Sequence, residues 1–285
     1  MNPYKSLPDR AFWRPSVADL SPFDIHDLWR PKFKLDERTR VVTYGSCFAQ
    51  HIGRALKERE FGWHVAEKGP PGFPEELLKA YNYEVFSSRT GNIYTTSLLR
   101  QWCDWASGAD KPPKEYWEKE GRFIDPFRPN IEPQGFASLD EMRRSRQYAI
   151  QCFKRSIREA EVFVFTLGLT ESWFNRSGGY EYPLCPGTLA GEFREDEHRF
   201  LNQDYAFVLD NLNQAMAIIR ELNPSIRFLL TVSPVPLVAT NSGEHVLVAT
   251  MHSKSILRAV AGHLAQTDEA VDYFPSYEVI NSPVF

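Results

Sequence analysis

The sequence predicts an α/β protein with a three-layer αβα architecture and a mostly parallel sheet. Three short runs rich in β-branched and aromatic residues alternate with long amphipathic stretches. The stretches between these runs are far longer than a hairpin needs, so crossover connections must join the strands. Sheets of this kind are covered by helices on both faces.

The first strand is expected at residues 40–44 because Arg-Val-Val-Thr-Tyr is β-branched and ends at Gly45-Ser46. The second strand, residues 161–167, ends at Gly168, and the third, residues 226–232, ends at Ser233-Pro234. Ligands bind beyond the carboxyl ends of the strands in such sheets. The loops that open at Gly45, Gly168 and Ser233 are therefore the expected site.

Helices are expected where apolar residues recur at helical spacing, as Phe48, Ile52 and Leu56 do directly after the first strand. The expected helices are residues 47–59, 98–106, 139–159, 202–222 and 250–266. Residues 1–37 are rich in proline and aromatic side chains without a clear period, and we expect an irregular N-terminal arm packed on a single domain of residues 38–285. Residues 111–133 carry five prolines and are expected to form a long surface connection or lid.

The charge and composition exclude several classes of function. The chain has 33 Lys and Arg against 37 Asp and Glu, so there is no basic field for nucleic acid. Its longest apolar stretches are too short to span a membrane, and the N-terminus lacks the apolar core of a secretory signal. The four cysteines have no zinc-ligand spacing, so we expect no metal site, reduced thiols and a cytoplasmic location.

Ser46 is the candidate nucleophile because it stands where a buried strand passes into a helix. Backbone N–H groups and the helix dipole can stabilise an anion there. Two alternatives remain at this stage. Ser46 could simply cap the helix at residues 47–59, and Cys47 could be the nucleophile because a helix N-terminus lowers a thiol pKa.

The segment Gly45-Ser46-Cys47-Phe48-Ala49 resembles the signature of the GSCFA family, which is similar to the SGNH/GDSL hydrolases and implies a flavodoxin-like fold. The resemblance extends over most of the chain from about residue 40. The other matching segments are Gly91-Asn92-Ile93-Tyr94-Thr95, Phe165 to Trp173, Cys185-Pro186-Gly187-Thr188, Thr231 to Val235, Ser253-Lys254-Ser255 and Tyr273 to Glu278.

The resemblance implies roles for individual residues. Ser46 takes the place of the nucleophile, whose own N–H helps to form the oxyanion hole, and Gly91, with Asn92, takes the place of the second donor. The third donor is an Asn in SGNH enzymes, but the matching turn here is Gly168-Leu169-Thr170-Glu171. Thr170 could donate, whereas Glu171 could orient another group or contact substrate. Alternatively, both begin a helix.

The general base of SGNH enzymes lies in an Asp-x-x-His segment, and no such segment precedes Phe285. Of the seven histidines, His252 is our candidate because it follows the third strand and opens a helix. Lys254 and Arg258 lie four residues apart on one face of that helix. They could bind an anionic donor or form a solvated face.

We therefore expect a serine-dependent esterase or O-acyltransferase that acts on a small-molecule or glycan acyl ester. It requires no cofactor, although a transferase could use an acyl-CoA donor. The alternative is a catalytically impaired SGNH-like binding module for a glycan or acyl ligand. The sequence specifies neither the substrate nor the oligomeric state.

Overall fold

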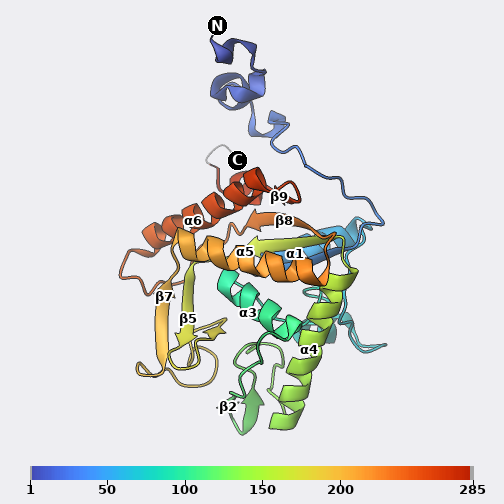
Figure 1. The fold of residues 1–285 in the computed structure, drawn as a ribbon, viewed down its shortest axis with the longest axis vertical. Helices are drawn as coiled ribbons and strands as arrows, with labels where there is room; N and C mark the ends of the chain where they lie inside the picture. The colour runs from blue at the N-terminus through green and yellow to red at the C-terminus, as the bar shows by residue number, and fades with distance from the viewer. Residues whose placement is uncertain (1, 283–285) are drawn as a thin grey trace.

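A four-stranded parallel sheet lies at the centre of residues 2–282, which the computed structural model describes (Figure 1). In order across the sheet its strands are β1 (Val41–Gly45), β4 (Val162–Leu167), β8 (Arg227–Val232) and β9 (Val271–Tyr273). Thr43 pairs with Val164, and Val164 pairs with Leu229. The predicted α/β class is confirmed, and β9 adds an edge strand that we did not expect.

Alternate side chains of the strands point to opposite faces of the sheet, and different elements cover the two faces. Tyr44, Phe165 and Leu230 belong to a core shared with four helices, whereas Val164 and Leu229 belong to a separate cluster with α1. Because β4, β8 and β9 follow one another in one direction across the sheet, right-handed crossovers place the helix that precedes each of them on the same face. The helices of the first face are α3 (Thr96–Ser107), α4 (Leu139–Glu159), α5 (Tyr205–Leu222) and α6 (Val246–Thr267), and α1 spans Ala49–Glu58. The result is the expected three-layer arrangement.

A second, antiparallel sheet follows β4 directly. It consists of β6 (Glu181–Tyr182), β5 (Glu171–Asn175) and β7 (His198–Asn202), in that order. Glu171 therefore begins a strand, and the alternative that Thr170 and Glu171 open a helix is wrong. The connection expected at residues 111–133 contains a hairpin of β2 (Trp117–Lys119) and β3 (Arg122–Ile124). Two short helices, α2 (Glu75–Ala80) and α7 (Ser276–Asn281), lie elsewhere in the chain. None of the described helices has both the length and the apolarity to cross a bilayer.

The N-terminal arm has two parts. Trp29, Phe33 and Leu35 pack against the sheet face that α1 covers, and the Trp29 ring meets the Phe274 ring at 5.1 Å between centroids. The preceding part extends away from the body of the protein (Figure 1). It contains the 3₁₀ turns η1 (Pro3–Ser6), η2 (Asp9–Ala11) and η4 (Pro22–Asp24) and the π-turn η3 (Arg14–Ala18), whose residues are not buried.

Candidate functional site

Ser46 lies at the turn between β1 and α1, at the carboxyl edge of the parallel sheet. The preceding Gly45 has φ +133°, and a Cβ at this position would collide with the carbonyl oxygen of Thr166. Only glycine fits this close approach. The Ser46 N–H donates to the same Thr166 oxygen at 3.1 Å. Ser46 is thus fixed against β4, and its own N–H, which is bonded to Thr166, is not free to stabilise an oxyanion.

The hydroxyl of Ser46 is buried and has no hydrogen-bond partner within the described residues. The residue as a whole is only 2% exposed. Ser46 does not cap α1, because that helix begins after Phe48 without a side-chain capping bond. Buried hydroxyls are almost always hydrogen-bonded, and leaving one unpaired costs about 1–3 kcal/mol. This oxygen therefore requires an explanation other than helix capping.

The turn after β4 packs against Ser46, and the segment that contains Gly91 packs against that turn through the Tyr94 backbone. A Cβ on Gly168 would lie 2.9 Å from the backbone carbonyl oxygen of Tyr94 and 3.0 Å from the Ser46 Cβ. The N–H groups of Gly168 and Leu169 both donate to that Tyr94 oxygen, at 3.0 and 3.1 Å. Ser46, Tyr94 and Gly168 are consequently packed together, and Gly168 leaves no room for a side chain.

The third expected loop also reaches this edge. The Ser233 N–H donates to the Leu167 oxygen at 2.9 Å, so the chain leaves β8 beside the end of β4. Ser233 is buried, and its hydroxyl accepts from the Val235 N–H at 3.3 Å. The three turns predicted to gather at one edge of the sheet do so.

Gly91 and Asn92 offer backbone donors next to a pocket. Gly91 has φ +70°, and the N–H groups of Gly91 and Asn92 have no partner among the described residues. The side-chain amide of Asn92 donates to the Tyr94 hydroxyl at 2.9 Å, while its oxygen is buried and unpaired. These groups line a pocket of about 260 Å³ with Gln50 and Arg128. The pocket can therefore offer both hydrogen-bond donors and an acceptor to a ligand.

Thr170 and Glu171 serve the surrounding structure. The Thr170 N–H donates to the Ser253 hydroxyl at 3.1 Å, and the Thr170 hydroxyl donates to the Asn202 side chain at 2.7 Å. Neither Thr170 donor is free for an oxyanion. The Glu171 carboxylate accepts from the Thr240 hydroxyl and from the Asn241 N–H, at 3.1 Å for the latter. Glu171 therefore anchors the loop between β8 and α6.

His252 and Lys254 lie on different sides of α6. His252 is exposed, and no hydrogen bond joins its side chain to another described residue. Lys254 is two positions further, about 200° around the helix, and it is only 2% exposed. Its Nζ donates to the Gly168 oxygen at 2.5 Å. The structure thus brings Lys254, rather than His252, to the group around Ser46.

Burial lowers the pKa of Lys254 to about 8, because the charged ammonium loses its hydration. The neighbouring Cys47 thiol opposes this effect. Cys47 is half-buried, and Tyr94, whose pKa burial and Cys47 raise to about 12, lies close to it. The sequence did carry a signal for the burial of Lys254, since Leu257, Ala261 and Leu264 follow it at helical spacing and are also buried.

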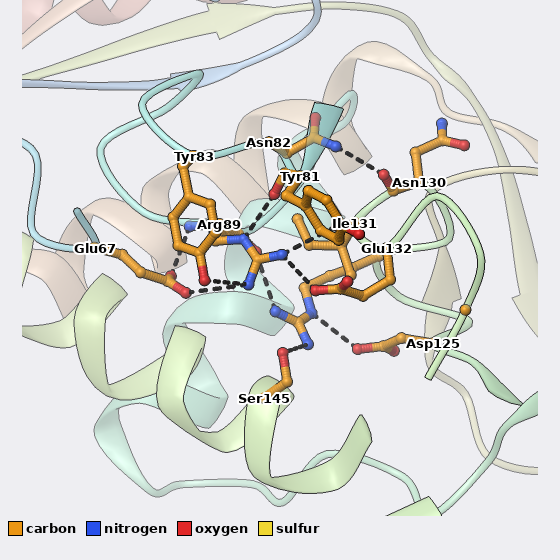
Figure 2. Close-up of polar contacts among 12 residues, drawn as sticks. Glu67, Tyr81, Asn82, Tyr83, Arg89, Asp125, Asn130, Ile131, Glu132 and Ser145 are labelled. Carbon is orange, nitrogen blue, oxygen red and sulfur yellow. Dashed lines mark hydrogen bonds and ion pairs between the residues drawn. The ribbon is translucent and has the colours of Figure 1, made fainter. Parts of the chain in front are cut away.

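A network of charged side chains lies beside the pocket and holds Arg128, which is one of the residues that line it (Figure 2). The guanidinium of Arg89 donates to the Glu132 carboxylate at 2.7 Å, and the backbone N–H of Arg89 donates to the Glu67 carboxylate at 2.8 Å. Arg128 donates to the Arg89 oxygen at 3.3 Å and to Asp125 at 2.8 Å. Burial alone would raise the pKa of the Asp125 carboxyl, but Arg146 and Arg128 hold it below its usual value. These contacts join segments that lie far apart in the sequence, so no local pattern predicted them.

The comparison with known proteins agrees with the motif. The GSCFA family model matches residues 40–284, which include Ser46, Gly91, Gly168 and Lys254. No curated protein and no solved structure gives a match. Within the described residues no group of three His, Cys, Asp or Glu side chains is arranged to hold a metal ion.

Proposed function

The chain belongs to the GSCFA family, and we propose that it is a serine-dependent acyl ester hydrolase or O-acyltransferase with Ser46 as its nucleophile. The observation that carries this proposal is the unpaired, buried hydroxyl of Ser46 at the carboxyl edge of the sheet. A hydroxyl kept free of hydrogen bonds at a stability cost is a candidate for chemistry. Its position between the strand-end loops supports the same conclusion.

Oxyanion stabilisation is assigned to the N–H groups of Gly91 and Asn92. Neither N–H has a hydrogen-bond partner among residues 2–282 and both residues line the pocket, whereas the N–H groups of Ser46 and Thr170 are already bonded. Removal of one such donor costs enzymes about 2.7–4 kcal/mol in the chemical step. The proposal therefore requires the developing negative charge of the tetrahedral intermediate to reach the pocket lined by Gly91 and Asn92, which Ser46 itself does not line.

The substrate is expected to carry a short acyl group. A pocket of about 260 Å³ lies below the usual range of about 300–1,000 Å³ for drug-sized ligands. Ser46 is 2% exposed and is not one of the residues that line this pocket, so neighbouring side chains must move to admit the ester carbonyl. A carbohydrate is the proposed carrier of the acyl group, and an acyl-CoA is the proposed donor if the reaction is a transfer. The four free thiols fit a reducing, cytoplasmic setting.

The burial of Ser46 also favours a second candidate function, a binding module for a glycan or acyl ligand that has lost catalysis. In that case Asn92 and the free N–H groups would bind the ligand, and the serine would play no part. The two functions differ in one measurable property, which is the reactivity of the Ser46 hydroxyl.

Fluorophosphonate labelling followed by peptide mapping tests this property. An active serine should be labelled at Ser46, and Ser46→Ala should abolish both the labelling and the hydrolysis of p-nitrophenyl acetate. Cys47→Ser is the matched control, because it changes the adjacent residue and should leave labelling of Ser46 in place. Absence of label from the folded wild type would exclude serine catalysis, and labelling lost only in the Cys47 variant would indicate the thiol as the nucleophile.

A further inference from the structure

We propose that Lys254 is the general base that activates Ser46, so that the chain uses a serine and lysine pair in place of a histidine. This inference rests on the function proposed above and names a further catalytic residue for it. Lysine can take this role only if it is close to the hydroxyl and uncharged for part of the time.

Gly168 brings the two side chains to the same place. The Lys254 Nζ donates to the Gly168 oxygen at 2.5 Å, and the Gly168 Cα lies so close to Ser46 that a Cβ there would be 3.0 Å from the Ser46 Cβ. Nζ has no hydrogen bond to the Ser46 hydroxyl in this state. Catalytic hydrogen bonds are often long before substrate binds, and a lysine side chain has four rotatable bonds with which to close the gap.

No carboxylate neutralises Lys254 within the described residues, because none lies within ion-pair distance of Nζ. The titratable groups that face it from neighbouring elements are the Cys47 thiol and, along the adjoining groove, Tyr277 of α7. Arg258, one turn along α6, is held by Glu278. A buried lysine without a counter-ion is favoured in its neutral form. With a pKa of about 8, about one molecule in ten carries neutral Lys254 at pH 7, compared with about one in 3,000 at the ordinary value.

The proposed step is balanced in protons and bonds. Neutral Lys254 takes the Ser46 hydroxyl proton while Oγ bonds to the ester carbonyl carbon. The ammonium then returns this proton to the leaving alkoxide as the old ester bond breaks. In the second half, Lys254 deprotonates water or an acceptor hydroxyl, which attacks the acyl carbon. The bond between the acyl carbon and Ser46 Oγ then breaks, the Lys254 ammonium returns the proton to Oγ, and the carboxylic acid or the new ester is released.

A purely structural role for Lys254, in which it braces the Gly168 carbonyl, predicts different behaviour from variants. Lys254→Arg keeps a charged donor for the carbonyl, but arginine cannot become neutral in the working pH range. Lys254→Met removes both the donor and the base while keeping the volume and the linear shape. His252→Gln is the matched control, since it alters the exposed neighbour on the same helix.

The experiment measures the rate of fluorophosphonate labelling of Ser46 between pH 6 and pH 9, together with the melting temperature of each variant. The wild-type rate should rise about 90-fold over this range, as a group with a pKa of about 8 loses its proton. Both Lys254 variants should be labelled at least about 100-fold more slowly at pH 8, and His252→Gln should match the wild type.

The outcomes separate the base from the nucleophile. A labelled wild type together with an undiminished rate in Lys254→Arg or Lys254→Met would overturn the role of Lys254 and leave the function of Ser46 standing. If neither variant folds, a wild-type rate that stays flat between pH 6 and pH 9 would overturn it instead. A wild type that is never labelled would overturn both proposals.

Discussion

Glu181 of β6 is a buried carboxyl whose partners are hydroxyl groups, and its ionisation should weaken the fold. The Thr95 hydroxyl donates to it at 2.5 Å, and the Ser97 hydroxyl also donates to it. Burial raises the pKa of Glu181 to about 7, although both hydrogen bonds oppose the shift. Since the folded-state pKa lies above the ordinary value of 4.5, the contribution to stability is complete below pH 4.5. It is lost as the pH rises through 7.

The magnitude follows from the two pKa values. At about 1.4 kcal/mol per pH unit, a difference between 4.5 and about 7 corresponds to about 3 kcal/mol in total. Most of this, about 2–3 kcal/mol, should be lost between pH 5 and pH 8. Glu181→Gln mimics the protonated carboxyl, because its amide keeps one acceptor and one donor. The variant should therefore be insensitive to this part of the pH range.

Urea unfolding at pH 5 and pH 8 measures the effect as a difference in the free energy of unfolding between wild type and Glu181→Gln. That difference should shift in favour of the variant by about 2–3 kcal/mol on going to pH 8. Glu118→Gln, at an exposed position on β2, is the control and should show less than about 0.5 kcal/mol. An equal difference between wild type and Glu181→Gln at both pH values would refute the reasoning.

Two further predictions concern the packing of the site. Gly168→Ala should lower the free energy of unfolding by about 1–3 kcal/mol and abolish fluorophosphonate labelling of Ser46, because the new Cβ would lie 3.0 Å from the Ser46 Cβ. Thermal unfolding measures the first effect, and mass spectrometry measures the second. Arg89→Met should cost about 3–5 kcal/mol in urea unfolding, because it leaves the buried carboxylate of Glu67 and the half-buried carboxylate of Glu132 without the guanidinium.

Each packing prediction has a control and a result that would contradict it. Gly72→Ala places a Cβ in open space at a turn with φ +82°, so it separates backbone strain from the contact with Ser46. Arg30→Met removes an exposed ion pair and should cost less than about 1 kcal/mol. Full labelling of Gly168→Ala, or equal costs for the two arginine variants, would contradict the packing described for the site.

The parallel sheet could be predicted because its strands are buried on both faces. Val162–Leu167 is a continuous apolar run that ends at glycine, and the helix Leu139–Glu159 begins after a serine that accepts from the Glu141 N–H at 3.2 Å. These are local signals. The strand Val271–Tyr273 was missed because three residues are too few to show a period.

The site was less predictable because its decisive contacts join distant segments. Lys254 resembled half of an exposed basic pair with Arg258, but the tertiary fold buries it against Gly168, and Arg258 turns to Glu278. Similarly, the motif indicated Ser46, but only the structure reveals that its N–H is bonded to Thr166. Sequence spacing places residues on an edge of the sheet, whereas hydrogen-bond availability depends on packing.

The segment from Trp29 to Leu35 shares with α1 the covering of one face of the parallel sheet. It covers a sheet face with Val41, Val162 and Val164 where α1 alone does not suffice, and the Lys32 N–H fastens it to Asp272 at 2.8 Å. The family match begins only at residue 40. The hydrophobic cluster on this face of the sheet therefore includes side chains that lie upstream of the region that the family model matches.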